Sequence, residues 1–157
     1  MKKILIAAVI AFAAVSLRAD ADGYFMLSVF SPGQLPAPSS TISGGRLSLI
    51  YGDCHELYGV DLGAAGSVRE RMNGAQLNLV WNSVGTDMAG FQFGVANNVD
   101  GYLAGLQLGL VGVSYELYGC QIGLVNVATH LYGCQIGLLN FATDRAWTFW
   151  PFINIGW

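Results

Sequence analysis

The sequence predicts an all-β fold: a short β-solenoid, or β-roll, of about seven repeats of 14–16 residues with capping strands. The first observation is a repetition, because LYGCQIGLVN at 117–126 returns almost unchanged as LYGCQIGLLN at 131–140. The second is the alternation of residues inside each copy, which has the period of a β-strand. The third is composition: 54% hydrophobic and 11% charged residues, which is too apolar for a disordered chain.

The repetition extends well upstream of that pair. Successive copies begin at a glycine, and the spacings are 15, 16, 15, 14 and 14 residues. These glycines are Gly59, Gly74, Gly90, Gly105, Gly119 and Gly133, and a vestigial copy spans 45–52. A near-constant period predicts stacked coils, in which each repeat buries its faces against its neighbours.

One position after the core of each copy holds only Gly or Asn. The residues are Gly52, Gly66, Asn82, Asn97, Gly112, Asn126 and Asn140. Gly and Asn adopt a positive φ more readily than other residues, so we predict a structural turn at this position in every unit. Each repeat would then consist of two short strands joined by that corner.

The alternation also predicts which side chains face the interior. Cys120, Ile122 and Leu124 point to one side of the strand, and Gln121 points to the other. We expect the apolar set to be buried between coils. The expected buried rows include Leu106 with Cys120 and Cys134, and Leu108 with Ile122 and Ile136.

This orientation would place columns of polar side chains outside. Gln92, Gln107, Gln121 and Gln135 would form a column on one outer face, and Tyr118 and Tyr132, together with Tyr58, would stack on the other. Such ladders are candidate binding surfaces for an extended polymer or another subunit. The structural alternative is that the glutamines hydrogen-bond along the stack while the tyrosines shield it.

The chain begins like a secretory signal peptide. A basic start precedes the apolar run Ile4–Ala14, which is too short to span a membrane, and Ala19-Asp20-Ala21 provides an A-x-A cleavage site. We therefore expect residues 1–21 to be removed, with a retained anchor as the alternative. The remainder would carry four arginines and nine acidic residues, a net charge of −5, which does not suit nucleic acid.

The rest of the chain divides by composition. Residues 22–44 should form an N-terminal strand and a Pro/Ser-rich linker, 45–146 the repeat domain, and 147–157 an aromatic C-terminal capping strand. Proline near an open sheet edge blunts it, so capping is the simplest role for this tail. A docking patch for a membrane or a partner is the alternative role.

A small outer-membrane antiparallel β-barrel is the alternative architecture. The apparent signal peptide, the glycine-rich alternation and the final Ile153-Asn154-Ile155-Gly156-Trp157 all suit one. Transmembrane strands need about 9–11 alternating residues, whereas the clean run here covers only Gly119–Val125. The Gly/Asn position also recurs in every unit, not in every second one, which favours the solenoid.

Few residues suggest chemistry. Asp53, Cys54, His55 and Glu56 are adjacent and cannot all converge on one ion, and the spacing of a zinc or other metal site is absent. No nucleophile elbow or phosphate loop occurs in the sequence. We therefore expect no catalytic residues, no cofactor and no metal site. The three cysteines are expected to act as small buried hydrophobes, with a strained disulfide between Cys120 and Cys134 of adjacent repeats as the alternative.

The motifs GLQLGLVG, GCQIGLVN and GCQIGLLN, with PFIN at 151–154, resemble the bacterial exported surface-repeat proteins with GxQxGLxN repeats, a family of uncharacterised function. That resemblance covers most of 45–157 and implies export and surface association. The expectation is thus an exported, non-enzymatic protein with a structural or adhesive role at the cell surface or in the periplasm. Its partners would be a cell-surface polymer, the outer membrane or a second copy. An integral barrel with a pore or scaffold role is the alternative.

Overall fold

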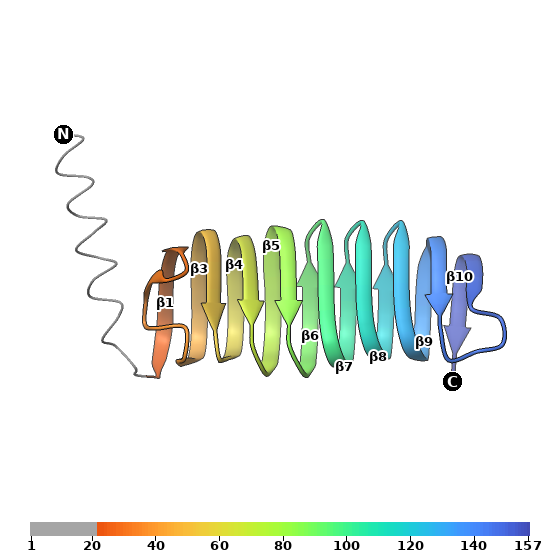
Figure 1. Cartoon of the computed structure of the whole chain (residues 1–157), viewed down its shortest axis with the longest axis horizontal. Helices are drawn as coiled ribbons and strands as arrows, with labels where there is room; N and C mark the ends of the chain where they lie inside the picture. Colours follow the sequence, from red (N-terminus) through yellow and green to blue (C-terminus); the bar gives the residue numbers. More distant parts are fainter. Residues whose placement is uncertain (1–21) are drawn as a thin grey trace.

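Residues 22–157 form a β-solenoid of about eight turns in the computed structural model (Figure 1). The coils stack along the long axis of the molecule, with β1 at one end and β10 at the other. All strands belong to one sheet, and their order follows the sequence from β3 to β10. The predicted fold class is confirmed, and the predicted signal peptide lies outside the described residues.

The strands have the following bounds. They are β1 (Gly23–Phe30), β2 (Gly33–Leu35), β3 (Thr41–Cys54), β4 (Glu56–Val68), β5 (Met72–Val84), β6 (Met88–Phe93), β7 (Ala96–Leu108), β8 (Val111–Ile122), β9 (Val125–Ala142) and β10 (Phe149–Gly156).

Neighbouring coils pair in parallel and in register with the repeat. Gly59 pairs with Gly74, and Gln107 pairs with Gln121, so equivalent residues stack one above another. Transmembrane barrels are built from antiparallel neighbours. The parallel ladder therefore contradicts the barrel alternative.

The two ends of the stack differ from its middle. β1 pairs in parallel with β3 as part of the stack, and the short β2 pairs with β1 in antiparallel fashion. At the other end β10 turns back against β9. Pro151 and the positive φ of Phe152, +68°, interrupt this last strand, which makes its outer edge a poor template for another chain.

The glycines with positive φ are not those that the sequence predicted. Among residues 22–157, positive φ belongs to Phe152 and to one glycine in each coil, with φ between +137° and +155°. The seven glycines are Gly44, Gly59, Gly74, Gly90, Gly105, Gly119 and Gly133. A Cβ on Gly119 would lie 1.9 Å from the carbonyl oxygen of Gly105, so this column of glycines lets the coils stack closely.

The Gly/Asn position is instead an interior one, and the prediction of a left-handed corner there is wrong. All seven residues are buried and none has a positive φ. They are Gly52, Gly66, Asn82, Asn97, Gly112, Asn126 and Asn140. We call them the asparagine column.

The interior of each coil has an aliphatic side and an amide side. The aliphatic side contains Met26, Ile42, Cys54, Leu57, Val68, Met72, Val84, Met88, Val99, Leu103, Leu117, Ala128, Leu131 and Ala142. On the amide side the asparagine column faces a second one, which we call the glutamine column. It consists of Arg46, Asp61, Gln76, Gln92, Gln107, Gln121 and Gln135, all of them buried.

The inward and outward sides of the first strand are thus the reverse of the prediction. Gln121 is fully buried, whereas Leu124 and Ile136 are exposed and Cys120 is half-buried. The rows predicted to be buried, from Leu106 to Cys134 and from Leu108 to Ile136, lie on the outside. This strand of each repeat therefore directs its amides inward and its aliphatic side chains outward.

Candidate functional site

The glutamine column is a continuous chain of side-chain hydrogen bonds. Each Nε2 donates to the Oε1 of the preceding coil: Gln92 to Gln76 at 2.8 Å, Gln107 to Gln92 at 2.8 Å, Gln121 to Gln107 at 2.7 Å and Gln135 to Gln121 at 2.8 Å. The same nitrogens also approach a backbone carbonyl of their own coil, such as Val113 at 3.2 Å from Gln107. Buried amides are therefore satisfied in both directions.

Both ends of this chain are closed. At the C-terminal end, Nδ2 of Asn154 on β10 donates to Oε1 of Gln135 at 2.9 Å. At the N-terminal end, Asp61 accepts from Gln76 at 3.2 Å and from Asn78 at 2.7 Å. A carboxylate is an acceptor only, so it ends a chain of donors that all point toward it.

Asp61 also neutralises the buried Arg46. Nε and Nη2 of Arg46 donate to the two carboxylate oxygens at 2.7 and 2.5 Å, and both side chains are fully buried. Burial alone would lower the pKa of Arg46, but the adjacent Asp61 raises it above its usual value. Two charge-assisted hydrogen bonds therefore join these side chains inside the fold.

The asparagine column runs in the opposite direction. Nδ2 of Asn82 donates to Asn97 at 2.8 Å, and Nδ2 of Asn126 donates to Asn140 at 2.8 Å, each time toward the following coil. Asn140 in turn donates to the carbonyl of Trp150 at 3.1 Å. Gly112 interrupts the column, and Oδ1 of Asn126 has no hydrogen-bond partner within residues 22–157.

The structure shows where the glutamines and tyrosines predicted to form outer-face ladders lie. Gln92, Gln107, Gln121 and Gln135 are inside, so the prediction of an outer-face glutamine ladder is wrong. Tyr118 and Tyr132 do lie outside and stack with ring centroids 4.5 Å apart, and Tyr102 continues this stack at 4.7 Å from Tyr118. Tyr58 lies on β4 and donates to Glu56 at 3.0 Å.

Surface charge is confined to one edge of the solenoid. Apart from Asp22 and the buried Arg46 and Asp61, the charged side chains of 22–157 lie in or beside a turn between two strands or, for Asp100 and Glu116, at the corresponding part of the coil within β7 and β8. We call this the polar edge; its acidic and basic members are Asp53, Glu56, Arg69, Glu70, Arg71, Asp87, Asp100, Glu116, Asp144 and Arg145. With seven acidic residues and three arginines, its net charge is −4.

The polar edge contains ion pairs between neighbouring turns. Arg69 contacts Asp53 at 2.5 Å, and His130 contacts Asp144 at 3.1 Å. His55 lies 3.7 Å from Glu70. Across residues 22–157 no three His, Cys, Asp or Glu side chains are grouped in a way that would hold a metal ion.

The three cysteines are free thiols. Cys54 is buried on the aliphatic side, and burial raises its pKa to about 11. Cys120 and Cys134 are half-buried on the outside of adjacent coils, and desolvation raises the pKa of Cys120 to about 12. Thiolate is the reactive form of cysteine, so Cys120 is a poor nucleophile.

One outer face of the solenoid is made only of apolar side chains. It consists of the outward positions between the positive-φ glycine and the next bend in each coil, and we call it the apolar face. The repeats contribute Leu47, Leu49, Val60, Leu62, Ala64, Ala75, Leu77, Leu79, Phe91, Phe93, Val95, Leu106, Leu108, Leu110, Cys120, Ile122, Leu124, Cys134, Ile136 and Leu138. The sequence alternation detected these residues but placed them inside.

The capping strands extend this face. Leu27 of β1 pairs with Leu47, and Ile153 of β10 pairs with Ile136. Nine levels of strands at the usual spacing of 4.7–4.9 Å give a face about 40 Å long. No charged or hydrogen-bonding side chain interrupts it, and Gly45, which also lies on it, is covered by the ring of Phe25.

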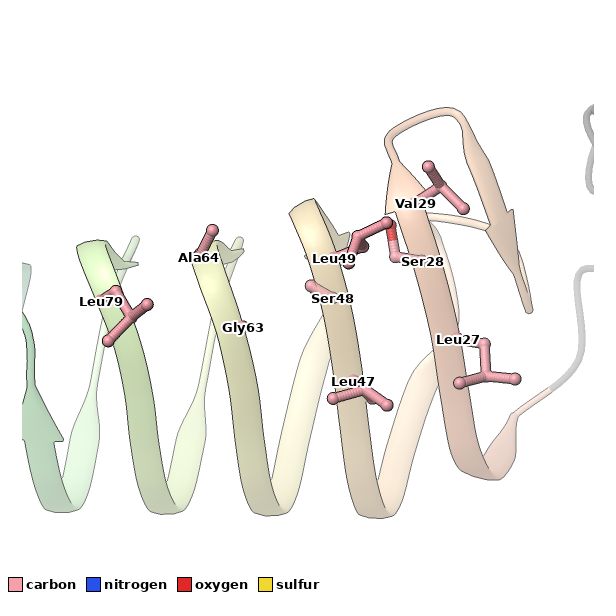
Figure 2. A pocket seen from close by; sticks show the side chains of 9 residues that line it. All are labelled: Leu27, Ser28, Val29, Leu47, Ser48, Leu49, Gly63, Ala64 and Leu79. Atoms are coloured by element: carbon pink, nitrogen blue, oxygen red, sulfur yellow. The ribbon is translucent and has the colours of Figure 1, made fainter.

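One notch interrupts the apolar face near its N-terminal end (Figure 2). It has a volume of about 460 Å³ and is lined by side chains of β1, β3, β4 and β5. These are Leu27, Ser28, Val29, Leu47, Ser48, Leu49, Gly63, Ala64 and Leu79. A second hollow, of about 390 Å³, lies among Trp147, Phe149, Trp150 and Pro151 at the opposite end.

Comparison of the chain with protein-family models, with curated proteins and with solved structures finds no match. Among residues 22–157, no helix has the length and hydropathy of a transmembrane span.

Proposed function

We propose that this chain is an exported, non-enzymatic structural protein that lies on a lipid surface through its apolar face. The observation that carries the proposal is the segregation of side chains: every outward residue of that face is apolar, while the surface charges lie on the polar edge. Soluble monomers rarely expose a continuous apolar surface of more than a few hundred Å². This face therefore needs a partner, and the proposal is that the partner is a bilayer.

The composition of the face favours lipid over protein as its partner. Protein interfaces are enriched in Tyr, Trp, Met and Arg at the centre and have a polar rim. The apolar face consists mainly of Leu, Ile and Val, which suit a hydrocarbon phase. Three of the four tryptophans are instead at the C-terminal end, where Trp147 and Trp157 are the most exposed. Tryptophan is typical of the boundary between hydrocarbon and water.

The proposed arrangement also gives the two polar columns a purpose. A protein whose outside meets lipid cannot use that outside to hold its coils together. The amides inside supply directional contacts between coils, each worth about 1 kcal/mol in net stability. Because the acidic polar edge would face water, attachment to lipid depends on apolar burial and not on charge.

The test is binding of the purified protein to zwitterionic phosphatidylcholine vesicles, measured by flotation. The double variant Leu110→Asp/Leu124→Asp places two charges on the apolar face at positions 49% and 48% exposed. Burying one leucine contributes about 2 kcal/mol, so we expect the vesicle partition coefficient to fall at least 100-fold. Binding of the unmodified protein should persist in 1 M salt.

Tyr115→Asp is the matched control, since this residue is 50% exposed and lies at the polar edge. It should leave vesicle binding within about twofold of the unmodified protein, in keeping with the small effect of surface substitutions away from an interface. If the unmodified protein stays in solution with vesicles and instead forms a dimer that the double variant abolishes, the partner is a second copy and the proposal fails.

A further inference from the structure

We infer that the notch on the apolar face is a binding site for one acyl chain of a membrane lipid. This inference rests on the proposed function and adds a defined site to it. The notch is where the apolar face departs from its own repeat, and four strands contribute to it.

The notch arises from two local differences in the coil of β4. At the outward position before the bend, β4 has Ala64, while the coils on either side have Leu49 and Leu79. The bend is also one residue shorter: Ala64 alone lies opposite Leu49 and Ile50 on one side and opposite Leu79 and Val80 on the other. The coil of β4 is therefore recessed, and its neighbours project as walls.

The floor of the notch is backbone at Gly63, whose missing side chain would face the coil interior, 3.0 Å from Oδ1 of the buried Asn78. A Cβ on Gly63 would lie 2.4 Å from the carbonyl oxygen of Ser48. The walls, in contrast, are long side chains directed outward: Leu49 is 71% and Leu79 is 70% exposed. Figure 2 shows these two leucines on either side of the short Ala64.

The lining specifies hydrocarbon as the ligand. Leu and Val form the walls, and neither an aromatic ring nor a charged group takes part. The hydroxyl of Ser28 already donates to the carbonyl of Tyr51 at 2.7 Å. A volume of about 460 Å³ is within the usual range for small-molecule sites. A linear acyl chain meets these conditions, and on the proposed function lipid chains lie directly against this face.

The site would therefore bind the chain and ignore the headgroup. With no charged residue in the notch, a lysophosphatidylcholine with a 12-carbon chain and free dodecanoate should bind with similar affinity. Because the site would not distinguish between headgroups, the acyl chains of the bilayer lipids themselves would occupy it. A strong preference for the free acid would assign the notch to fatty acid and not to membrane lipid.

The experiment is calorimetric titration of the purified protein with 12-carbon lysophosphatidylcholine below its micelle concentration, compared with dodecanoate. We expect one bound chain per protein and dissociation constants within about threefold of each other. Ala64→Leu fills the notch with the residue found in the neighbouring coils, so it should fold normally and lose at least tenfold in affinity. Val95→Leu, at the same position two coils along, should keep full affinity.

The outcomes separate this inference from the proposed function. If Ala64→Leu still binds vesicles but no longer binds the soluble probe, both stand. Vesicle binding by an unmodified protein that takes up no probe overturns the notch while leaving the lipid-facing role intact. An affinity for dodecanoate more than tenfold above that for lysophosphatidylcholine, or an affinity unchanged by Ala64→Leu, also overturns it.

Discussion

The coils of β3 and β4 and the coils of β8 and β9 fill the same interior positions with different chemistry. The first two have Arg46 and Asp61 in the glutamine column and glycine in the asparagine column. In β8 and β9 the glutamine column has Gln121 and Gln135, and the asparagine column has Asn126 and Asn140. Charged side chains thus occur with glycine in β3 and β4, and amides occur with asparagine in β8 and β9.

The close distances explain this difference. A Cβ on Gly66 would lie 2.4 Å from Oδ2 of Asp61 and 2.5 Å from Nη2 of Arg46, so the ion pair occupies the space that an asparagine would need. A Cβ on Gly52 would lie 2.1 Å from Oγ of Ser48 and 3.2 Å from Cδ of Arg46, so these two side chains occupy that space in the coil of β3. In the coils of β3 and β4 the ion pair therefore fills interior volume that Gln and Asn side chains share in the coils of β8 and β9.

The largest effect is expected where the N-terminal coils depart most from the others. Asp61→Ala leaves Arg46 charged and fully buried without its counterion and removes an acceptor from Gln76 and Asn78. Breaking a buried pair in this way costs about 3–5 kcal/mol. We expect urea unfolding, followed by circular dichroism, to show a loss of this size, and hydrogen exchange to show it first in β3 and β4.

The matched control converts these coils to the chemistry of β8 and β9. Arg46→Gln/Asp61→Gln removes both charges and extends the glutamine column, so it should unfold at a higher urea concentration than Asp61→Ala alone. A double variant that is no more stable than Asp61→Ala would show that the N-terminal coils depend on the ion pair itself and not on how their interior volume is filled.

A smaller effect is expected in the regular coils. Gln121→Ala removes the acceptor for Nε2 of Gln135 and the donor for Oε1 of Gln107. Each buried polar group left without a partner costs about 1–3 kcal/mol of stability, and less where neighbouring side chains shift to pair with it. Hydrogen exchange of β8 and β9 should therefore accelerate, with little change in β3, because repeat stacks are stabilised by contacts between neighbours.

Leu124→Ala is the control for this prediction because it shortens an outward side chain three residues away. In solution it should change stability by less than about 0.5 kcal/mol. Equal losses from the two substitutions would mean that the glutamine column does not hold the coils together more than the apolar face does.

The fold was predictable from the sequence because a repeat period constrains stacking strongly. Equivalent residues such as Gln107 and Gln121 had to lie one above another once the period was recognised. The inward side was not predictable from alternation alone, because a period of two identifies two sides of a strand without saying which is buried. The usual assumption that apolar residues are inside fails for the strand that contains the glutamines, since a column of Gln satisfies its own hydrogen bonds when stacked.

The turn was missed for a related reason. Gly and Asn at one position suggested a positive φ, but Asn126 is there to donate to Asn140 and to the carbonyl of Ile136. The glycine that requires a positive φ opens each copy of the motif, as Gly119 does, where it was treated only as a marker of the repeat. Asn154 lies in the PFIN segment that the sequence resemblance includes, but only the structure shows that it ends the glutamine column.

The smallest effect is expected at Gly112, the position where a regular coil lacks its asparagine. The site differs from the glycines of the N-terminal coils because a Cβ there would lie 3.1 Å from Oε1 of Gln107 and 3.4 Å from Oδ1 of Asn126, close contacts that small shifts relieve. Gly112→Asn would place a donor beside Oδ1 of Asn126 and make the asparagine column continuous from Asn82 to Asn140. The gain should be about 1 kcal/mol, the net value of one hydrogen bond, seen as a higher urea midpoint.

Gly66→Asn is the control that sharpens the comparison: its side chain would collide with the buried ion pair, so it should lower the midpoint. If both substitutions lower the midpoint, the volume shared by the two columns is already full in every coil, and the gap beside Asn126 is not a missing asparagine.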